Sequence, residues 1–549
     1  MDSVLCNHVL ELAFASSKPR PDPFNDVSLD ALVAAPDGEV ALYPAFWAGG
    51  DIWKLRVSAE TPGIYQYATI CSDVSDGGLH GMSGEFEAIS GAEGNALYKH
   101  GRLVAGEGGR HISHADGTPF FWLADTWWMA MVARVSLADF EMLVKDRAAK
   151  GFTVAQLCAG LLPAFRDGHI WDERAANEGG FPWEQGFAAI NPAYFDFADK
   201  RMEILLENGI VPCIFGAWGE FLDRMGVEKM KAHWRYLVAR WGAYPVVWSL
   251  CGEALLFYEK AGRETVLERR KGWTEVCRYL RGVNPHKRLI TVHPTDPNDS
   301  RSMLDDEGLV DINMLQTGHL PYAVDITVQT VKSSIAKEPP MPVINGEVCY
   351  EGIHGACWHD VQRFYFWSAV LSGAAGHAYG AVTLHVFQTR EERHVHDNDC
   401  FFVDGCWEDD YKLPGSYQVG LGRRFMERYP WQRFSRRAES GMTGEEALYS
   451  FAAGIEKQVW AFYLPSLAMP EKYQYYCCYG HSWGDEKKLY IQIEPGADFF
   501  AFFFNPRTGE DSFVEDVVPN DDGAWLFPQK PSGEDWLLVL QGKNDSTRV

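Results

Sequence analysis

The stretch PVINGEVCYEG, residues 342–352, begins with a short apolar run and places Glu347 at its end and Glu351 just beyond it. A short apolar run that ends at a charged residue is typical of a strand buried in a parallel sheet. The carboxyl ends of such strands are where these sheets carry functional residues. The stretch therefore raises the question of which glutamate does chemistry, and with which partner.

Seven further apolar runs of the same kind lie between residues 119 and 380. They are residues 119–126, 153–159, 211–218, 246–253, 288–294, 312–318 and 376–380. Amphipathic segments typical of helices separate most of them, such as 136–151, 194–209 and 359–373. Eight such units over about 260 residues predict an α/β fold, a (β/α)₈ TIM barrel. A doubly wound open sheet is the alternative, but no G-x-G-x-x-G motif follows the first run.

The segments on both sides of this region are predicted to be all-β. Alternating apolar and polar residues, interrupted by Gly, Pro and Asp, fill the first 100 residues and return after about residue 440. NPRTGE, residues 505–510, has the composition of a hairpin turn. We therefore expect an N-terminal β-sandwich over residues 1–100, a catalytic barrel over 101–435 and a C-terminal β-sandwich over 436–549.

Composition and charge exclude several classes of partner. The chain has 549 residues and a net charge of −25, which disfavours binding to nucleic acid and to anionic membranes. The aromatic content is high, at 14% with 20 Trp, and this favours a carbohydrate partner. The sequence has no apolar stretch near about 20 residues, as a membrane span would need, and no basic segment before an apolar run at its start.

The cysteine pattern bears on the compartment. Cys158, Cys213, Cys251 and Cys349 lie inside apolar runs, and we expect them to be buried free thiols. Free thiols suit a reducing environment. We therefore expect a cytoplasmic protein.

Polar or aromatic residues stand at or just after the end of nearly every predicted barrel strand. They are Asp125, Trp127, Trp128, Gln156, Trp218, Glu253, His293, Gln316, His319, Glu347 and Tyr379. A barrel acts at this rim, so these side chains are candidates for a binding site. Each also has a structural interpretation: Asp125 could cap a loop, the histidines could be satisfied rim residues, and at least one of the tryptophans should belong to the core.

Glu253 and Glu347 are the candidate catalytic pair. They end the fourth and seventh runs, which face each other across a ring of eight strands. Two facing carboxyl groups are what glycoside hydrolysis needs, since one donates a proton to the leaving oxygen and the other attacks the anomeric carbon or activates water. Glu351 then lies in the following loop, where it contacts substrate or holds the loop.

These motifs resemble the apiosidase-like glycoside hydrolases. The matching stretches are residues 116–128, 146–156, 246–253, 311–319, 342–352 and 373–380, with similar flanking sandwiches. The resemblance implies a retaining mechanism with Glu253 as acid/base and Glu347 as nucleophile. It further implies a sugar pocket lined by Asp125, His293, Gln316, His319, Tyr350, Glu351 and Tyr379. One departure is Cys251-Gly252-Glu253, where that family commonly has Gly-Gly-Asp.

The sequence thus predicts a retaining glycoside hydrolase that needs no metal or organic cofactor. We expect exo action on a plant or microbial oligosaccharide or glycoside, with a pentose as one candidate sugar. Two sandwiches beside a barrel are also compatible with a homo-oligomer. The alternatives are a carbohydrate-binding protein with a degenerate barrel and a metal-dependent hydrolase that uses HVHDND, residues 394–399.

Overall fold

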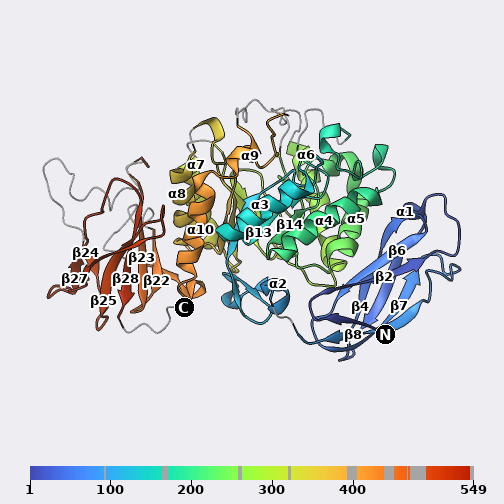
Figure 1. Ribbon diagram of the computed structural model, residues 1–549, viewed down its shortest axis with the longest axis horizontal. Coiled ribbons are helices and arrows are strands. Elements are labelled where there is room, and N and C mark those ends of the chain that lie inside the picture. Colours follow the sequence, from blue (N-terminus) through green and yellow to red (C-terminus); the bar gives the residue numbers. More distant parts are fainter. Residues whose placement is uncertain are drawn as a thin grey trace.

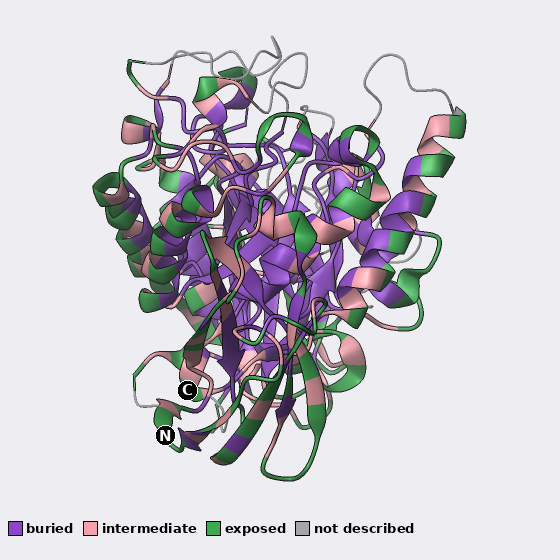
Figure 2. Cartoon of the chain, turned by 90° about the vertical axis from the view of Figure 1, so that its right-hand side faces the viewer, coloured by how far each residue is buried: buried purple, intermediate pink, exposed green. Residues whose placement is uncertain are grey.

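A computed structural model gives the fold (Figure 1). It describes residues 1–91, 94–163, 171–256, 263–319, 323–355, 357–391, 405–437, 451–466, 468–469 and 490–543. A barrel lies in the middle of the molecule, with one all-β unit at each end (Figure 1). Its buried residues concentrate in the barrel interior (Figure 2).

All eight predicted runs form barrel strands. The strands are β12 (Trp122–Thr126), β13 (Val154–Cys158), β14 (Val211–Phe215), β15 (Val247–Ser249), β16 (Ile290–Thr291), β18 (Asn313–Gln316), β19 (Val343–Glu347) and β20 (Gly376–Tyr379). Their order is β16-β15-β14-β13-β12-β20-β19-β18, and neighbouring strands in this order pair in parallel. A short strand, β17 (Asn298–Asp299), adds to β18 in antiparallel fashion. The predicted TIM barrel is confirmed.

The barrel closes between β16 and β18 through a few direct hydrogen bonds. The amide of Asp311 donates to the carbonyl of Ile290 over 2.7 Å, and the hydroxyl of Thr291 donates to the carbonyl of Ile312 over 2.9 Å. These bonds join the first and last strands of the parallel set. The carboxyl ends of all eight strands therefore meet at one rim.

Helices surround the barrel, including those predicted from the sequence. They are α3 (Leu137–Lys150), α4 (Pro192–Glu207), α5 (Phe221–Trp241), α6 (Arg263–Gly282), α7 (Ala323–Ile335), α8 (His359–Val370) and α10 (Pro414–Met426), with a short α9 (Trp407–Asp410). Local chemistry sets the ends of α3: the side chain of Ser136 accepts from the amide of Asp139, and Gly151 ends the helix with φ of 95°.

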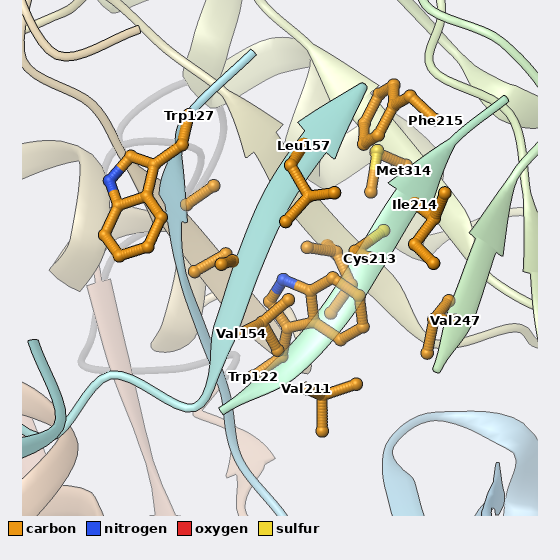
Figure 3. Packing of buried hydrophobic residues seen from close by; sticks show 14 of the residues in the cluster. Trp122, Trp127, Val154, Leu157, Val211, Cys213, Ile214, Phe215, Val247 and Met314 are labelled. Atoms are coloured by element: carbon orange, nitrogen blue, oxygen red, sulfur yellow. The ribbon is translucent and has the colours of Figure 1, made fainter. Parts of the chain in front are cut away.

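Apolar side chains fill the barrel and the space between its strands and helices. Figure 3 shows part of this packing around β12, β13 and β14, including Trp122, Val154 and Cys213. These three side chains are at most 1% exposed. The lower barrel is thus a packed core, and open chemistry is confined to the rim.

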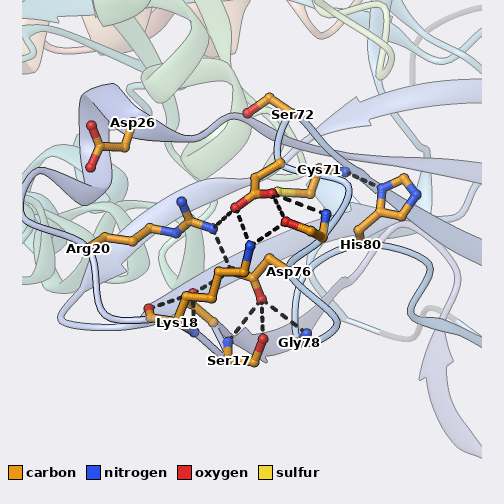
Figure 4. A network of polar contacts seen from close by, with 12 residues as sticks. Ser17, Lys18, Arg20, Asp26, Cys71, Ser72, Asp76, Gly78 and His80 are labelled. Carbon is orange, nitrogen blue, oxygen red and sulfur yellow. Dashed lines mark hydrogen bonds and ion pairs between the residues drawn. The ribbon is translucent and has the colours of Figure 1, made fainter.

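Two small sheets form the N-terminal unit. One contains β1 (Asp2–Leu5), β8 (Ser83–Ile89), β7 (Gly63–Cys71), β3 (Leu29–Ala34) and β4 (Val40–Pro44), in that order; the other contains β2 (Val9–Ala15), β6 (Ile52–Ser58) and β5 (Phe46–Gly49). Apolar residues of both sheets share one core. The fully buried Asp76 fixes the adjoining loops, because it pairs with Arg20 at 2.6 Å and accepts hydrogen bonds from Ser16 and Ser17 (Figure 4).

A small connector and a second all-β unit complete the chain. The connector contains α2 (Ala96–Lys99), β9 (Leu103–Ala105), β10 (Ile112–His114) and β11 (Pro119–Phe120), and a short α1 (Pro23–Asp26) lies in the N-terminal unit. The C-terminal strands are β21 (Ser435–Arg436), β22 (Phe451–Ile455), β23 (Val459–Leu464), β24 (Tyr490–Gln492), β25 (Phe499–Phe504), β26 (Asp511–Asp516), β27 (Ala524–Leu526) and β28 (Trp536–Gly542). The predicted turn at 505–510 joins β25 to β26, with the amide of Asn505 donating to Glu510.

Buried ion pairs attach both all-β units to the barrel. Arg56 of β6 pairs with Asp199 of α4 at 2.8 Å. Arg363 of α8 makes a two-pronged contact with Asp535 of the C-terminal unit, at 2.7 and 2.8 Å, and both side chains are 1% exposed. Removing one partner of such a pair would leave a buried charge uncompensated, so each contact fixes its unit against the barrel.

The cysteines follow the prediction at three of the four named positions. Cys158, Cys213 and Cys251 are free and buried, whereas Cys349 forms a disulfide with Cys357. The prediction of a free thiol at Cys349 is wrong because the loop after β19 folds back, with the amide of Gly352 donating to the carbonyl of Cys357, and brings the two residues together. The thiol pattern therefore no longer supports a cytoplasmic location. Within the described residues, no helix is both long and apolar enough to span a membrane.

Candidate active site

A β-bulge aims Glu347 into the barrel. Val343 and Leu315 belong to an apolar cluster with Val331 of α7 and Ala369 of α8, so they face the helices. Strict alternation would point Glu347, four residues after Val343, the same way. The pairing of β18 with β19 shifts by one residue at Gly346, however, so Gln316 lies opposite Glu347. Such bulges re-aim side chains, and this one turns Glu347 to the mouth.

Two histidines and a tyrosine lie against the carboxylate of Glu347. Its Oε2 lies 2.5 Å from Nε2 of His293, and its Oε1 lies 3.1 Å from Nε2 of His319 and accepts a hydrogen bond from the hydroxyl of Tyr350. Burial alone would raise the pKa of Glu347, but the two histidines outweigh it and lower that pKa well below its usual value. The pKa of His319 is raised in turn, since its contact with Glu347 outweighs burial. Glu347 is therefore ionised at neutral pH.

Glu253 is held across the mouth in an unusual backbone conformation. Its φ is 45°, in the left-handed region that non-glycine residues seldom occupy. Beyond the end of β14, Trp218 pairs with Gly252, and the amide of Gly219 donates to the carbonyl of Gly252 over 2.7 Å. Backbone strain of this kind gathers at functional sites when the surroundings enforce it.

Neutral donors, rather than cations, surround the carboxyl group of Glu253. Nε1 of Trp218 donates to Oε2 over 3.2 Å, and Nε2 of Gln316 donates to Oε1 over 3.0 Å. Burial and the negative charge of Glu347 raise the pKa of Glu253. The two glutamates thus have pKa values shifted in opposite directions, as an acid and a nucleophile require.

Further predicted residues support this centre from inside the barrel. Gln156 donates to the carbonyl of Gly346 over 2.9 Å, a contact between strands that are not neighbours and therefore across the interior. Trp128 donates to the hydroxyl of Tyr350 over 2.9 Å, and its ring packs on Trp218. We call Glu253, His293, Gln316, His319, Glu347 and Tyr350 the mouth cluster.

The structure places three other candidates elsewhere, together with Arg147, which the sequence did not single out. Asp125 lies 2.5 Å from Arg147 of α3 with both side chains fully buried, and Tyr379 donates to Glu351 over 2.6 Å. Arg147 also lies 5.9 Å from the ring of Tyr379. We call Asp125, Arg147, Glu351 and Tyr379 the wall cluster, because it lies between the strands and helices α3 and α10.

The wall cluster changes the predicted roles of its members. The contacts of Asp125, Glu351 and Tyr379 are with the helix layer and with each other, so they give no support to the prediction that these residues line the sugar pocket. Trp127 likewise packs on Phe140 of α3 and belongs to the core. The physical reason is the alternation of side chains along a strand. Asp125 pairs in register with Tyr379, and both side chains point outward from the barrel, toward the helices.

One residue near the mouth was missed by the sequence interpretation. His385 follows β20, is 4% exposed, and stacks on Tyr350 with ring centroids 4.7 Å apart. Only the recurrence of His beyond a strand end could have indicated it. The HVHDND segment, residues 394–399, lies outside the described residues, and among those described no three His, Cys, Asp or Glu side chains form a group that could hold a metal.

A barrel with two facing glutamates of opposite pKa shift has the equipment of a glycoside hydrolase. The family model of the apiosidase-like catalytic domain matches residues 106–433, well over half of the chain. The chain belongs to this family, as its motifs predicted. A domain of unknown function, DUF5060, matches residues 4–72 in the N-terminal unit. The comparison with curated proteins found no match.

Solved structures agree on the fold. A glycoside hydrolase with 22% sequence identity superposes with a TM-score of 0.65, over 82% of this chain and 99% of that one. A glycoside hydrolase of family 5 from Bacteroides vulgatus gives the same identity and TM-score, over 82% of this chain and 95% of that one. A further Bacteroides vulgatus protein, 17% identical, has a TM-score of 0.69 over 99% and 100% of the two chains. The fold is thus that of barrel enzymes, and membership of the apiosidase-like family makes the chain a glycoside hydrolase.

Proposed function

We propose that this enzyme is a retaining glycosidase that works by double displacement. The observation that carries this proposal is the contrast between the two pKa shifts: His293 and His319 lower the pKa of Glu347, whereas burial and the charge of Glu347 raise the pKa of Glu253. The substrate we propose is an oligosaccharide or glycoside attacked from its end. The family description, apiosidase-like, favours a pentose as the sugar released.

In the first step, Glu347 attacks the anomeric carbon and Glu253 donates its proton to the departing oxygen. A covalent glycosyl ester on Glu347 forms as the glycosidic bond breaks. In the second step, Glu253, now ionised, takes a proton from water while that water attacks the same carbon. The ester breaks, Glu347 is restored, and the sugar leaves with its original anomeric configuration.

Neighbouring groups can hold the sugar during these steps. Oε1 of Gln316 and Oε1 of Gln156 are buried acceptors without a hydrogen-bond partner within the described part of the chain. Sugar hydroxyls would satisfy both atoms. Trp128 and Trp218 donate hydrogen bonds to Tyr350 and Glu253 of the mouth cluster, and aromatic rings at this place would suit the apolar face of a sugar ring.

The test is hydrolysis of a panel of aryl pentofuranosides and pyranosides, both anomers, by the wild type and by Glu347→Gln side by side. We expect turnover of one sugar, loss of it in the variant, and a first-formed product with the anomeric configuration of the substrate by NMR. Turnover that survives the substitution would remove Glu347 as nucleophile. An inverted product would replace double displacement by single displacement.

The same proposal fixes the pH dependence. Activity requires an ionised Glu347 and a protonated Glu253, so it should fall on the acid side as Glu347 gains a proton and on the alkaline side as Glu253 loses one. The lowered pKa of Glu347 moves the acid limb down, and the raised pKa of Glu253 moves the alkaline limb up. A broad plateau through neutral pH is expected.

A further inference from the structure

A third glutamate at the rim, Glu220, is not used by the mechanism above. It follows β14 and directly precedes helix α5, whose N-terminus its side chain does not cap. The residue is 9% exposed, and its Oε2 is buried with no hydrogen-bond partner among the residues that the structure describes. A buried carboxyl oxygen without a partner is unusual, and a hydroxyl group of a bound ligand would supply the missing hydrogen bond.

The backbone places Glu220 beside the acid/base. Trp218 pairs with Gly252, and Gly219 is packed so tightly that a Cβ there would lie 2.5 Å from the carbonyl oxygen of Glu253. Glu220 is the next residue along this segment. The two carboxyl groups are therefore carried by adjoining segments of the rim.

The charges of the neighbourhood support this location. Burial raises the pKa of Glu220 to about 7, and the negative charge of Glu253 contributes to the rise. Glu220 and Glu347 both help to raise the pKa of Cys158, the last residue of β13. These effects agree with the backbone geometry, which places Glu220 on the rim segment that adjoins Glu253.

Because Glu220 lies on the same side of the mouth as Glu253, it can bind only one part of the substrate. In a double displacement, the acid/base stands beside the departing oxygen, so groups next to it meet the leaving group rather than the sugar bound to the nucleophile. A carboxyl group there offers hydrogen bonds to hydroxyl groups, and it offers nothing to a flat aromatic ring.

We propose that Glu220 binds a hydroxyl group of the leaving group, which makes the natural substrate a glycoside whose leaving group is itself a sugar or another polyol. This inference rests on the proposed double-displacement function. It assigns Glu220 to specificity for the leaving group, while Glu253 and Glu347 carry the bond cleavage.

The experiment compares two substrates that share one sugar. One is the 4-nitrophenyl glycoside most active in the panel, and the other is a disaccharide with the same sugar and linkage configuration. For Glu220→Ala and Glu220→Gln we expect kcat/KM on the disaccharide to fall at least about 30-fold and about fivefold, respectively. On the aryl glycoside both variants should stay within about threefold, which also shows that they fold. Glu228→Gln, an exposed glutamate of α5, is the matched control.

The pH profile distinguishes leaving-group binding by Glu220 from an indirect effect of Glu220 on the pKa of Glu253. If Glu220 acted only on the pKa of Glu253, both substrates would lose activity alike and the alkaline limb would move, which would overturn the proposal. Equal activity of both variants and the wild type on the disaccharide would overturn it too. A wild-type enzyme that cleaves neither substrate would overturn the proposed function, and this inference with it.

Discussion

The mouth cluster and the wall cluster each contain a tyrosine that donates a hydrogen bond to a glutamate, but the pKa of that glutamate is shifted in opposite directions. In the mouth, Tyr350 donates to Glu347 beside two histidines, and the pKa of Glu347 is lowered. In the wall, Tyr379 donates to Glu351, and burial raises the pKa of Glu351 to about 7. Glu347 and Glu351 stand four residues apart, so the two histidines beside Glu347, not the sequence neighbourhood, give the two pKa shifts their opposite directions.

The largest expected difference is in activity. Glu347→Gln removes the nucleophile and should lower kcat/KM by about 10⁴-fold or more, because residues of a catalytic unit have effects of that size. Glu351→Gln should stay within about threefold, since its contacts with Tyr379 and Gly415 are with the protein itself. Steady-state kinetics of both variants on the best panel substrate measure this. A loss of about 10³-fold or more in Glu351→Gln would place the wall cluster in the reaction.

The second difference is in stability as a function of pH. The pKa of Glu351 lies near 7 in the folded chain and near about 4.3 in an unfolded one, so the folded state binds the proton more tightly. The free energy of unfolding should therefore fall as pH rises from about 5 to about 8, by up to about 3 kcal/mol from this residue. Glu351→Gln removes this contribution.

Denaturant unfolding of the wild type and Glu351→Gln at pH 5, 6, 7 and 8 provides the check. The variant should gain stability relative to the wild type as pH rises. Glu228→Gln, an exposed substitution, should run parallel to the wild type throughout. If Glu351→Gln also ran parallel, Glu351 would be ionised in the folded chain and the contrast between the clusters would fail.

Much of this contrast is beyond the reach of sequence patterns. The eight strand positions follow from short apolar runs, and Glu253 and Glu347 follow from what ends two of them. The pattern of alternation alone would point Glu347 toward the helices, and only the bulge at Gly346 reverses it. Such a bulge depends on pairing with β18, a contact between distant segments.

The wall cluster also shows that the sequence does not predict which way a side chain at a strand end points. Tyr379 ends β20 as Glu347 ends β19, and Asp125 is the last residue but one of β12. Both face outward, because their strands carry no register shift where they pair. Arg147, which pairs with Asp125, lies in a helix whose pattern gives no sign of a buried charge. A polar residue at a strand end thus indicates the rim but not the face.

The third difference concerns the two tyrosines. Tyr350→Phe removes a hydrogen bond to a charged carboxylate, worth about 1.5–3 kcal/mol, so kcat/KM should fall roughly 10- to 100-fold. The pKa of Glu347 should rise with the loss of this donor, which moves the acid limb of the pH profile upward. Tyr379→Phe should leave both activity and the acid limb unchanged. A pH profile of Tyr350→Phe that overlies the wild type would show that Tyr350 does not act on Glu347.

The smallest difference is expected one contact further out, at the adjacent residues Trp128 and Trp127. Trp128 donates to the hydroxyl of Tyr350, whereas Trp127 packs on Phe140 and Phe387. A neutral hydrogen bond contributes about 0.5–1.5 kcal/mol, so Trp128→Phe should lower kcat/KM about two- to tenfold. Trp127→Phe, the matched control, should affect stability alone.

A double variant decides whether Trp128 acts through Tyr350. If Trp128 only orients the tyrosine hydroxyl, Trp128→Phe should cost nothing further once Tyr350→Phe has removed that hydroxyl, and the two losses should not add. Additive losses would mean that Trp128 meets the substrate directly, through its ring beside Trp218. In either case, the loss of kcat/KM should decrease with distance from the reacting carbon in the mouth cluster. Substitutions in the wall cluster should show no such order.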